Sequence, residues 1–159
     1  MTDSSKPWQP RAITEEQARQ KLEAQCARTE YCLSDIRRKM QRWALTEAEK
    51  KRITEQLLKD RFVDEERYAR AFVRDKFRFN RWGMVKIELE LKRRGISQDV
   101  IDVAKEEVSD EDRTATLKRL LEEKAKTITA KTDYERMGKL YRFALSKGYT
   151  YDEISQILD

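Results

Sequence analysis

The sequence predicts an all-α protein made of three tandem three-helix repeats that form an elongated, curved array. Charged residues make up 41% of the 159 residues, against a usual share of roughly 25%, which indicates a thin core beneath a charged surface. There are only four glycines and two prolines, and both prolines lie in the first ten residues, so few breakers remain for the turns of a β fold. A helix, turn and cap pattern also recurs along the chain.

A helix is expected wherever a capping side chain or an acidic first turn precedes apolar residues spaced three or four apart. Nine such helices are predicted, beginning at or near Thr14, Ser34, Thr46, Asp64, Met84, Ser97, Asp110, Asp133 and Thr150. Six of them have predicted ranges, which are 14–28, 64–80, 84–94, 110–126, 133–147 and 150–158. The residues expected to face inward are Ala18, Leu22 and Cys26; Ile36 and Met40; Ile53 and Leu57; Tyr68, Phe72 and Val73; Ile87 and Leu91; Val100, Ile101, Ala104 and Val108; and Leu117, Leu120 and Leu121.

Three of the caps, Thr46, Ser97 and Thr150, recur at periods of 51 and 53 residues. Before each cap stand an apolar residue and a small one, namely Leu45 and Ala44, Ile96 and Gly95, and Tyr149 and Gly148. This periodicity predicts three-helix repeats over 13–62, 63–109 and 110–159. The polar segment before them is predicted to be a disordered tail over 1–12. A chance similarity within a helix-rich sequence is the alternative.

Positive charge is concentrated in the middle of the chain. The formal net charge is +5 overall, but it is 0 over residues 1–33, +8 over 34–94 and −3 over 95–159. A basic centre between neutral and acidic ends favours a local surface that binds a polyanion, with an ordinary basic surface as the alternative.

Cys26 and Cys32 are the only cysteines, and there is no histidine. The usual four-ligand zinc site therefore cannot form within one chain, and no metal or cofactor is expected. On one helix the two cysteines would stand about 9 Å apart along the axis, too far for a disulfide, so both are predicted to be reduced, half-buried packing residues of a cytoplasmic protein. No segment is apolar enough for a membrane span or a signal peptide.

The most distinctive feature of the sequence is a row of arginines between residues 67 and 81. At 100° per residue these arginines fall within an arc of about 80° of one helix, opposite a face formed by Tyr68, Ala69, Phe72, Val73 and Phe79. Phosphate binding would explain such a row, because the planar guanidinium matches phosphate oxygens. Pairing with acids such as Asp64, Glu65 and Glu66, or with acids of the third repeat, is the alternative.

More basic residues accumulate in the predicted second and fifth helices. The complete candidate surface for nucleic acid or a nucleoprotein filament consists of Arg37, Arg38, Arg42, Arg67, Arg70, Arg74, Arg78, Arg81, Lys86, Lys92, Arg93 and Arg94. Trp43 and Trp82 stand beside these residues at helix ends, where they could stack on bases, although packing between repeats is favoured.

No catalytic chemistry is apparent in the sequence. There is no histidine base, no glycine-rich phosphate loop and no nucleophile in a recognisable context, so the protein is not expected to be an enzyme. The acidic clusters at 64–66 and 110–112 are interpreted as helix caps in preference to metal ligands.

Several segments resemble the RecX family of regulatory proteins. The stretch from Phe62 to Asp75, with Trp82, Gly83, Ile87, Leu89, Leu91, Lys92 and Gly95 to Ser97, is similar to the family's central repeat. Tyr31, Cys32, Ser34, Ile36 and Arg37 to Met40 resemble the first repeat, and Lys147 to Thr150 loosely resemble the third. The resemblance covers roughly residues 20–158.

The resemblance implies a non-enzymatic protein that binds the RecA recombinase filament, together with single- and double-stranded DNA with weak sequence preference. It further implies inhibition of recombination, DNA repair and the DNA-damage response, and we expect a monomer. Two alternatives stay open. One is a helical-repeat adaptor that binds only protein, and the other is a helix-turn-helix DNA-binding protein.

Overall fold

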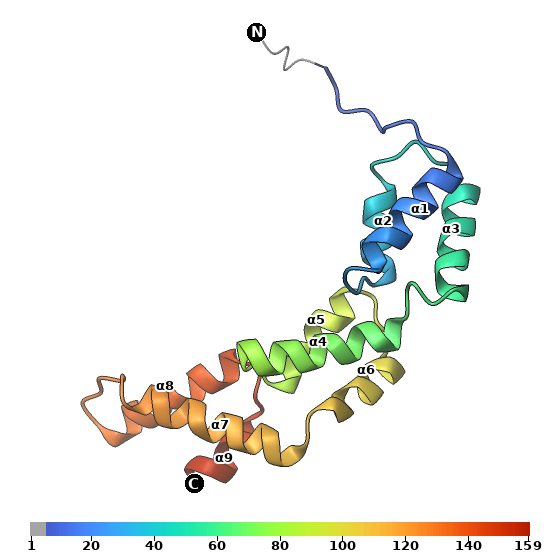
Figure 1. The fold of residues 1–159 in the computed structure, drawn as a ribbon. Coiled ribbons are helices and arrows are strands. Elements are labelled where there is room, and N and C mark those ends of the chain that lie inside the picture. Colours follow the sequence, from blue (N-terminus) through green and yellow to red (C-terminus); the bar gives the residue numbers. More distant parts are fainter. Residues whose placement is uncertain (1–5) are drawn as a thin grey trace. The chain divides into compact units, whose positions relative to one another are not determined.

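The structure, a computed structural model, describes residues 6–159, and every regular element in that range is helical (Figure 1). These elements are α1 (Glu15–Cys26), α2 (Leu33–Met40), α3 (Glu47–Lys59), α4 (Glu65–Asn80), α5 (Met84–Arg93), α6 (Gln98–Ala104), the 3₁₀ helix η1 (Lys105–Glu107), α7 (Asp110–Ala125), α8 (Asp133–Ser146) and α9 (Tyr151–Leu158). The predicted all-α class with tandem three-helix units is confirmed.

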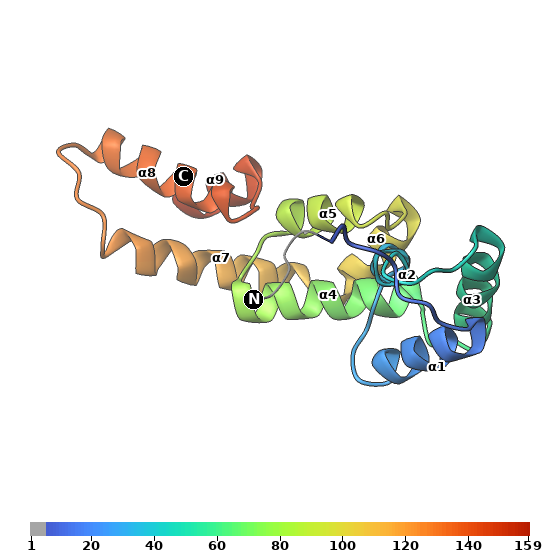
Figure 2. The same ribbon diagram turned by 90° about the horizontal axis from the view of Figure 1, so that it is seen from above.

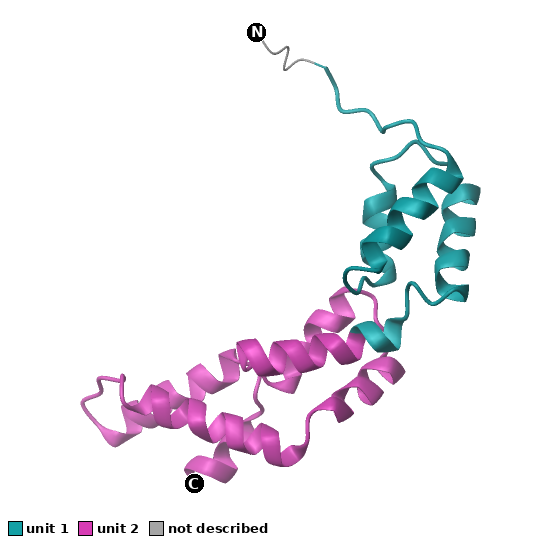
Figure 3. Ribbon diagram, viewed as in Figure 1, with its two compact units in different colours: residues 1–68 teal, residues 69–159 magenta. Residues whose placement is uncertain are grey.

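The helices divide into two compact units, residues 1–68 and 69–159, with the boundary inside α4 (Figure 3). In the first unit α1, α2 and α3 enclose a core that contains the residues predicted from helical spacing except Cys26, which is half-buried and packs against that core. This core consists of Ala18, Leu22, Ile36, Met40, Ile53, Leu57 and Val63.

The segment before α1 is anchored at one point in the described part of the chain. The backbone N–H of Arg11 donates to the carbonyl of Arg42 at 3.0 Å, and the N–H of Ala44 donates to the carbonyl of Arg11 at 2.8 Å. A disordered tail was predicted over residues 1–12, and residues 1–5 of that range lie outside the described part of the chain.

The two cysteines do not share a helix. Cys26 ends α1 and is half-buried, whereas Cys32 is the N-cap of α2 and is fully buried, so the prediction of a half-buried side chain is wrong for Cys32. The Cys32 thiol donates to the carboxylate of Asp35 at 3.2 Å, and that carboxylate also accepts from the Cys32 N–H. Burial of Cys32 follows from this capping arrangement, which the sequence pattern did not indicate.

In the second unit α7 and α8 are the two arms of a helical hairpin, and α9 packs against both (Figure 2). Their shared core consists of Leu117, Leu120, Leu121, Leu140, Ala144, Tyr149 and Ile154. Residues of α4, α5 and α6 are buried in the same unit, namely Ala69, Val73, Met84, Ile87, Leu91, Ile101 and Ala104. Val108 is buried as expected but lies beyond α6, in extended backbone after η1.

Two loops of the second unit, 81–83 and 147–149, are joined backbone to backbone. The N–H of Gly83 donates to the carbonyl of Lys147 at 2.7 Å, and the N–H of Val85 donates to the carbonyl of Gly148 at 3.1 Å. The buried Tyr149 adds its hydroxyl, which donates to the carbonyl of Arg81 at 3.0 Å. These bonds fix the end of α4 and the start of α5 against the turn between α8 and α9.

Candidate nucleic-acid interface

Helix α4 carries four of the five arginines that the sequence places on one face. Glu65 and Glu66 form an acidic first turn, which interacts favourably with the positive end of the helix dipole. Asp64 caps the helix, because its carboxylate accepts the N–H of Arg67 at 2.9 Å. That hydrogen bond is the main reason why the pKa of Asp64 lies below its usual value. The acidic cluster at 64–66 therefore starts a helix, as expected.

The fifth arginine, Arg81, lies outside the helix, which corrects the predicted five-arginine face. Helix α4 ends at Asn80, and Arg81 has a left-handed backbone with φ of 56°. A helical wheel assumes right-handed backbone throughout, so it cannot place this side chain. Phe79 is a second correction, because it was expected on the buried face but is 73% exposed in the last turn of α4.

Most guanidinium groups of this row are already paired with carboxylates. In the first unit Arg67 contacts Glu30 at 2.5 Å. In the second unit Arg70 and Arg74 contact opposite oxygens of Glu107, at 3.1 and 3.6 Å.

At the end of the row, Arg81 contacts Glu123 on α7 at 2.8 Å. Arg78 makes no ion pair with any described residue, and its guanidinium lies 5.6 Å from the centre of the Phe79 ring. The alternative of internal pairing thus applies to four of the five arginines, mostly through acids that the sequence did not single out.

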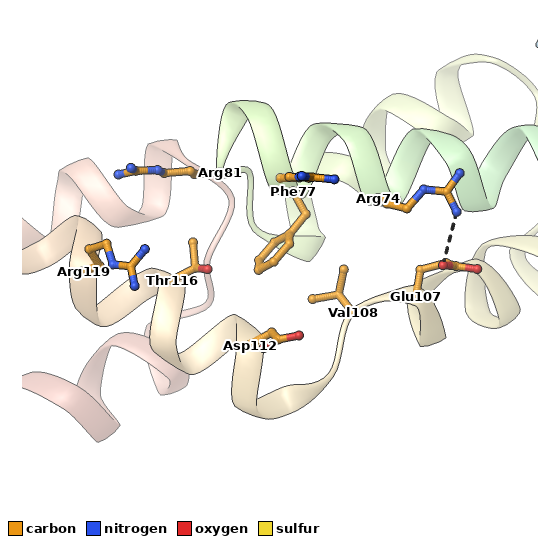
Figure 4. Close-up of a pocket in the computed structure, with 9 residues that line it drawn as sticks. Arg74, Phe77, Arg81, Glu107, Val108, Asp112, Thr116 and Arg119 are labelled. Atoms are coloured by element: carbon orange, nitrogen blue, oxygen red, sulfur yellow. Dashed lines mark ion pairs between the residues drawn. The ribbon is translucent and has the colours of Figure 1, made fainter. Parts of the chain in front are cut away.

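The end of α4 borders an open groove of about 370 Å³ in the second unit (Figure 4). The groove is lined by α4, by the segment that leads into α7, and by α7 itself. Its lining residues are Arg74, Phe77, Arg78, Arg81, Glu107, Val108, Asp112, Thr116 and Arg119. Four cations therefore face two anions, and the ring of Phe77 projects from α4 into the space between them (Figure 4).

Arg119 and Phe77 are functional candidates that the sequence analysis missed. Arg119 lies in the acidic third repeat, yet it is exposed on α7 beside the buried pair Leu120 and Leu117 and lines the groove. It makes no ion pair with any described residue. Helical spacing around those leucines could have shown that it is exposed, but not that it lies opposite α4.

The basic residues of α2 fall into two places in the first unit. Arg38 and Arg42 line a hollow of about 310 Å³ with Lys39, whose ammonium lies 4.3 Å above the ring of Tyr31. Arg38 also contacts Asp35 at 3.6 Å. Arg37 lines a different hollow, so α2 does not present one continuous basic face.

The basic residues of α5 are mostly neutralised by neighbours on the same helix. Lys92 contacts Glu88 at 3.4 Å, and both Arg93 and Arg94 contact Glu90, at 2.6 and 3.2 Å. None of them lines the groove at α4.

The two tryptophans next to the basic residues are half-buried. Trp43 packs against the core of the first unit. The ring of Trp82 is covered by the ammonium groups of Lys76 and Lys86, at 5.0 and 4.5 Å from its centre. These contacts agree with packing as the main role of both side chains.

The described residues contain neither a cluster of metal ligands nor a membrane-spanning helix. Within residues 6–159 no three His, Cys, Asp or Glu side chains are grouped as metal ligands would be. None of the helices in that range combines the length and apolar character that crossing a membrane requires.

Fold and groove together define a protein of tandem three-helix units with a basic, aromatic-containing groove. Family models also identify three-helix domains in the chain. Residues 64–104 match the second three-helix domain of RecX, and residues 110–158 match the third. The two matches together span more than half of the chain, and the chain belongs to the RecX family.

Several curated relatives are regulatory proteins RecX from clostridia. The chain is 32% identical over 126 residues to that of Clostridium perfringens (strain SM101), which covers 78% of this chain and 58% of the relative. It is 35% identical over 99 residues to the RecX of Clostridium botulinum (strain Eklund 17B), and this alignment covers 61% of this chain and 46% of the relative. The chain therefore spans about half the length of the curated relatives it matches.

Solved structures share the fold. RecX from Lactobacillus salivarius superposes with a TM-score of 0.83 at 19% identity, over 91% of this chain and 94% of that chain. A second regulatory protein RecX superposes with a TM-score of 0.80 at 20% identity, over 91% and 73%.

Proposed function

We propose that this chain is a regulator that binds the RecA recombinase filament and DNA and inhibits recombination, DNA repair and the DNA-damage response. Membership of the RecX family supports the RecA filament as the partner. The groove at α4 supports the DNA contact, because it brings together Arg74 and Arg78 from α4, Arg81 from the loop after it and Arg119 from α7. Guanidinium groups facing an aromatic ring are suited to phosphates and bases with little sequence preference.

The protein acts in this proposal as a cytoplasmic monomer, by binding and without catalysis. The twelve basic residues predicted from the sequence do not contribute equally. Arg78 has no ion pair among the described residues, so it can bind a new anion without breaking an ion pair. The basic residues of α5 are paired locally and are assigned a minor role.

The decisive experiment uses Arg78→Gln/Arg119→Gln, because neither side chain forms an ion pair with a residue that the structure describes. Cosedimentation with RecA filaments on single-stranded DNA and inhibition of strand exchange are measured together with circular dichroism. We expect both activities to fall about tenfold or more while the helical signal stays unchanged, since each charged contact contributes about 1 kcal/mol or more.

The matched control is Lys118→Gln/Arg142→Gln, which removes the same charge from two exposed positions of α7 and α8 that do not line the groove. Wild-type inhibition by Arg78→Gln/Arg119→Gln, or an equal loss in the control, would contradict the assignment of the groove.

A protein-only adaptor is the second candidate, favoured by the carboxylates that already occupy most of the arginine row. It predicts cosedimentation with the filament but no retardation of naked DNA at low salt. The proposed function predicts retardation that weakens steeply as salt is added, because bound phosphates release counterions.

A further inference from the structure

Two of the arginines that line the groove at α4, Arg74 and Arg81, are paired with carboxylates. Glu107 stands between two guanidinium groups, with Oε1 at 3.1 Å from Arg70 and Oε2 at 3.6 Å from Arg74 (Figure 4 shows the second pair). Glu123 holds Arg81 at 2.8 Å. Arg78 and Arg119, which also line the groove, have no ion pair with any described residue.

Glu107 is placed between the arginines by the local backbone. It is the last residue of η1, and the chain then extends through Val108 to Ser109, the N-cap of α7. Its side chain is 24% exposed, whereas the Arg74 side chain is 56% exposed. The carboxylate therefore lies against the wall of the groove while the guanidinium that it holds stays open to solvent.

The pairs of Arg74 and Arg81 are weak enough to be exchanged, because both of these arginine side chains are exposed. Ion pairs between exposed side chains contribute only about 0.2–1 kcal/mol. The carboxylates are nevertheless part of the same chain, so their effective concentration is on the order of millimolar, and a lone anion in solution competes poorly with them. A chain of linked phosphates is different, because it can bind Arg78 and Arg119 first and then reach Arg74 and Arg81 at high effective concentration.

We propose that Glu107 and Glu123 are internal competitors for the arginines of this groove, which are released only when a strand of nucleic acid displaces both carboxylates. The groove then rejects single anions and accepts linked phosphates. This inference rests on the proposed function, whose DNA contact it deepens.

A nucleic-acid strand fits the groove better than an acidic protein segment does. The ring of Phe77 lies inside the groove beside Val108, and the guanidinium groups stand around it. Proteins that bind single strands combine a basic groove with an aromatic side chain on which a base stacks. Carboxylates of a protein would pair with the arginines but would leave this ring without a stacking partner.

The test measures binding of a fluorescent oligothymidylate to the full chain and to Glu107→Gln, Glu123→Gln and the double variant. Each single substitution removes one competitor and is expected to raise affinity roughly 1.5- to fivefold, and the double variant is expected to gain more. Inorganic phosphate at millimolar concentration and constant ionic strength should displace the oligonucleotide from the double variant but not from the wild type.

The matched controls are Glu122→Gln and Glu55→Gln/Glu122→Gln, which change the charge equally at exposed residues outside the groove. An equal gain of affinity in the controls would overturn the proposal, because net charge alone would then explain the effect. Unchanged affinity in the double variant would also overturn it.

Absence of oligonucleotide binding in every variant would overturn it too, and retained cosedimentation with filaments would then show that the regulatory function survives through protein contacts. Stronger cosedimentation of the double variant without oligonucleotide binding would identify an acidic protein surface as the occupant instead.

Discussion

Gly83 and Gly148 stand so close that a β-carbon on Gly83 would lie 2.3 Å from the Gly148 carbonyl oxygen. Gly83 has φ of −74°, which any residue tolerates, so the requirement for glycine comes from this contact and not from its own backbone. Gly148 has φ of 99° and needs glycine for its conformation as well. The contact joins the loop between α4 and α5 to the turn between α8 and α9.

Gly83→Ala is expected to destabilise the protein by about 2 kcal/mol or more, because the atoms that the new methyl group meets are backbone atoms and cannot rotate away. Urea unfolding followed by circular dichroism measures the effect. Gly138→Ala is the control, since its β-carbon would meet only the end of the Arg142 side chain at 3.5 Å. Within α8 that change is expected to stabilise by about 0.5–1 kcal/mol, and equal stability of the two variants would refute the contact argument.

Tyr149→Phe removes the hydroxyl that donates to the carbonyl of Arg81. We expect a loss of about 0.5–1.5 kcal/mol in the free energy of unfolding at pH 8. Burial, with Glu153 nearby, raises the pKa of Tyr149 well above its usual 10.0. In alkali the unfolded chain therefore loses this proton while the folded chain keeps it, so wild-type stability falls as pH rises above about 10.

The Tyr149→Phe variant has no phenol group at this position that could lose a proton. The difference in unfolding free energy between the two proteins is therefore expected to narrow as pH rises from 9 to 11.5. Unfolding free energies measured across this range test the prediction, and a constant difference would contradict it.

Glu88→Gln is expected to remove an acid-sensitive part of the stability. Hydrogen bonds from Lys105 at 2.6 Å, from Gln98 at 2.7 Å and an ion pair with Lys92 lower the pKa of Glu88 to about 2. A lowered carboxyl pKa stabilises the folded state above the unfolded value of 4.5, and this contribution disappears as pH falls from 4.5 to about 2.

Because solvent screens these ion pairs, we expect the free energy of unfolding of Glu88→Gln to be lower than that of the wild type by up to about 1 kcal/mol at pH 7. Near pH 2 the two proteins should be equally stable. Glu55→Gln, at an exposed position outside this network, serves as the control and should change little at either pH. A difference for Glu88→Gln that persists at pH 2 would show that packing, not charge, is responsible.

Thr46→Ala should weaken the start of α3. The Thr46 hydroxyl accepts the N–H of Glu49 at 3.1 Å, and the Glu49 side chain accepts the N–H of Thr46 at 3.0 Å. Loss of this capping box is expected to cost about 1 kcal/mol in thermal or urea unfolding. Thr46→Ser keeps the hydroxyl and is expected to retain most of the stability, and if serine were no better than alanine the cap would not be the cause.

Helix positions and caps could be predicted because they depend on neighbours a few residues away. Thr46, Ser97 and Thr150 cap helices as expected. Apolar residues such as Ile36 and Leu117 are buried where their spacing places them. These features follow from the backbone geometry of a single helix, which is the same in any protein.

The candidate site could be predicted only in part. The basic character of α4 was evident in the sequence, but Arg81 leaves the helix, and its guanidinium is positioned by Glu123, which lies 42 residues away. Arg119 joins the groove because α7 lies beside the end of α4, and no local pattern encodes that approach.

The sequence was enough to predict an all-helical repeat protein that resembles RecX and has a basic centre. Contacts between distant segments were needed to show which arginines are already neutralised, that Glu107 stands between two of them, and that Gly83 must be glycine. Helix formation is governed by interactions within a few turns, whereas ion pairs and close backbone contacts depend on how distant segments meet.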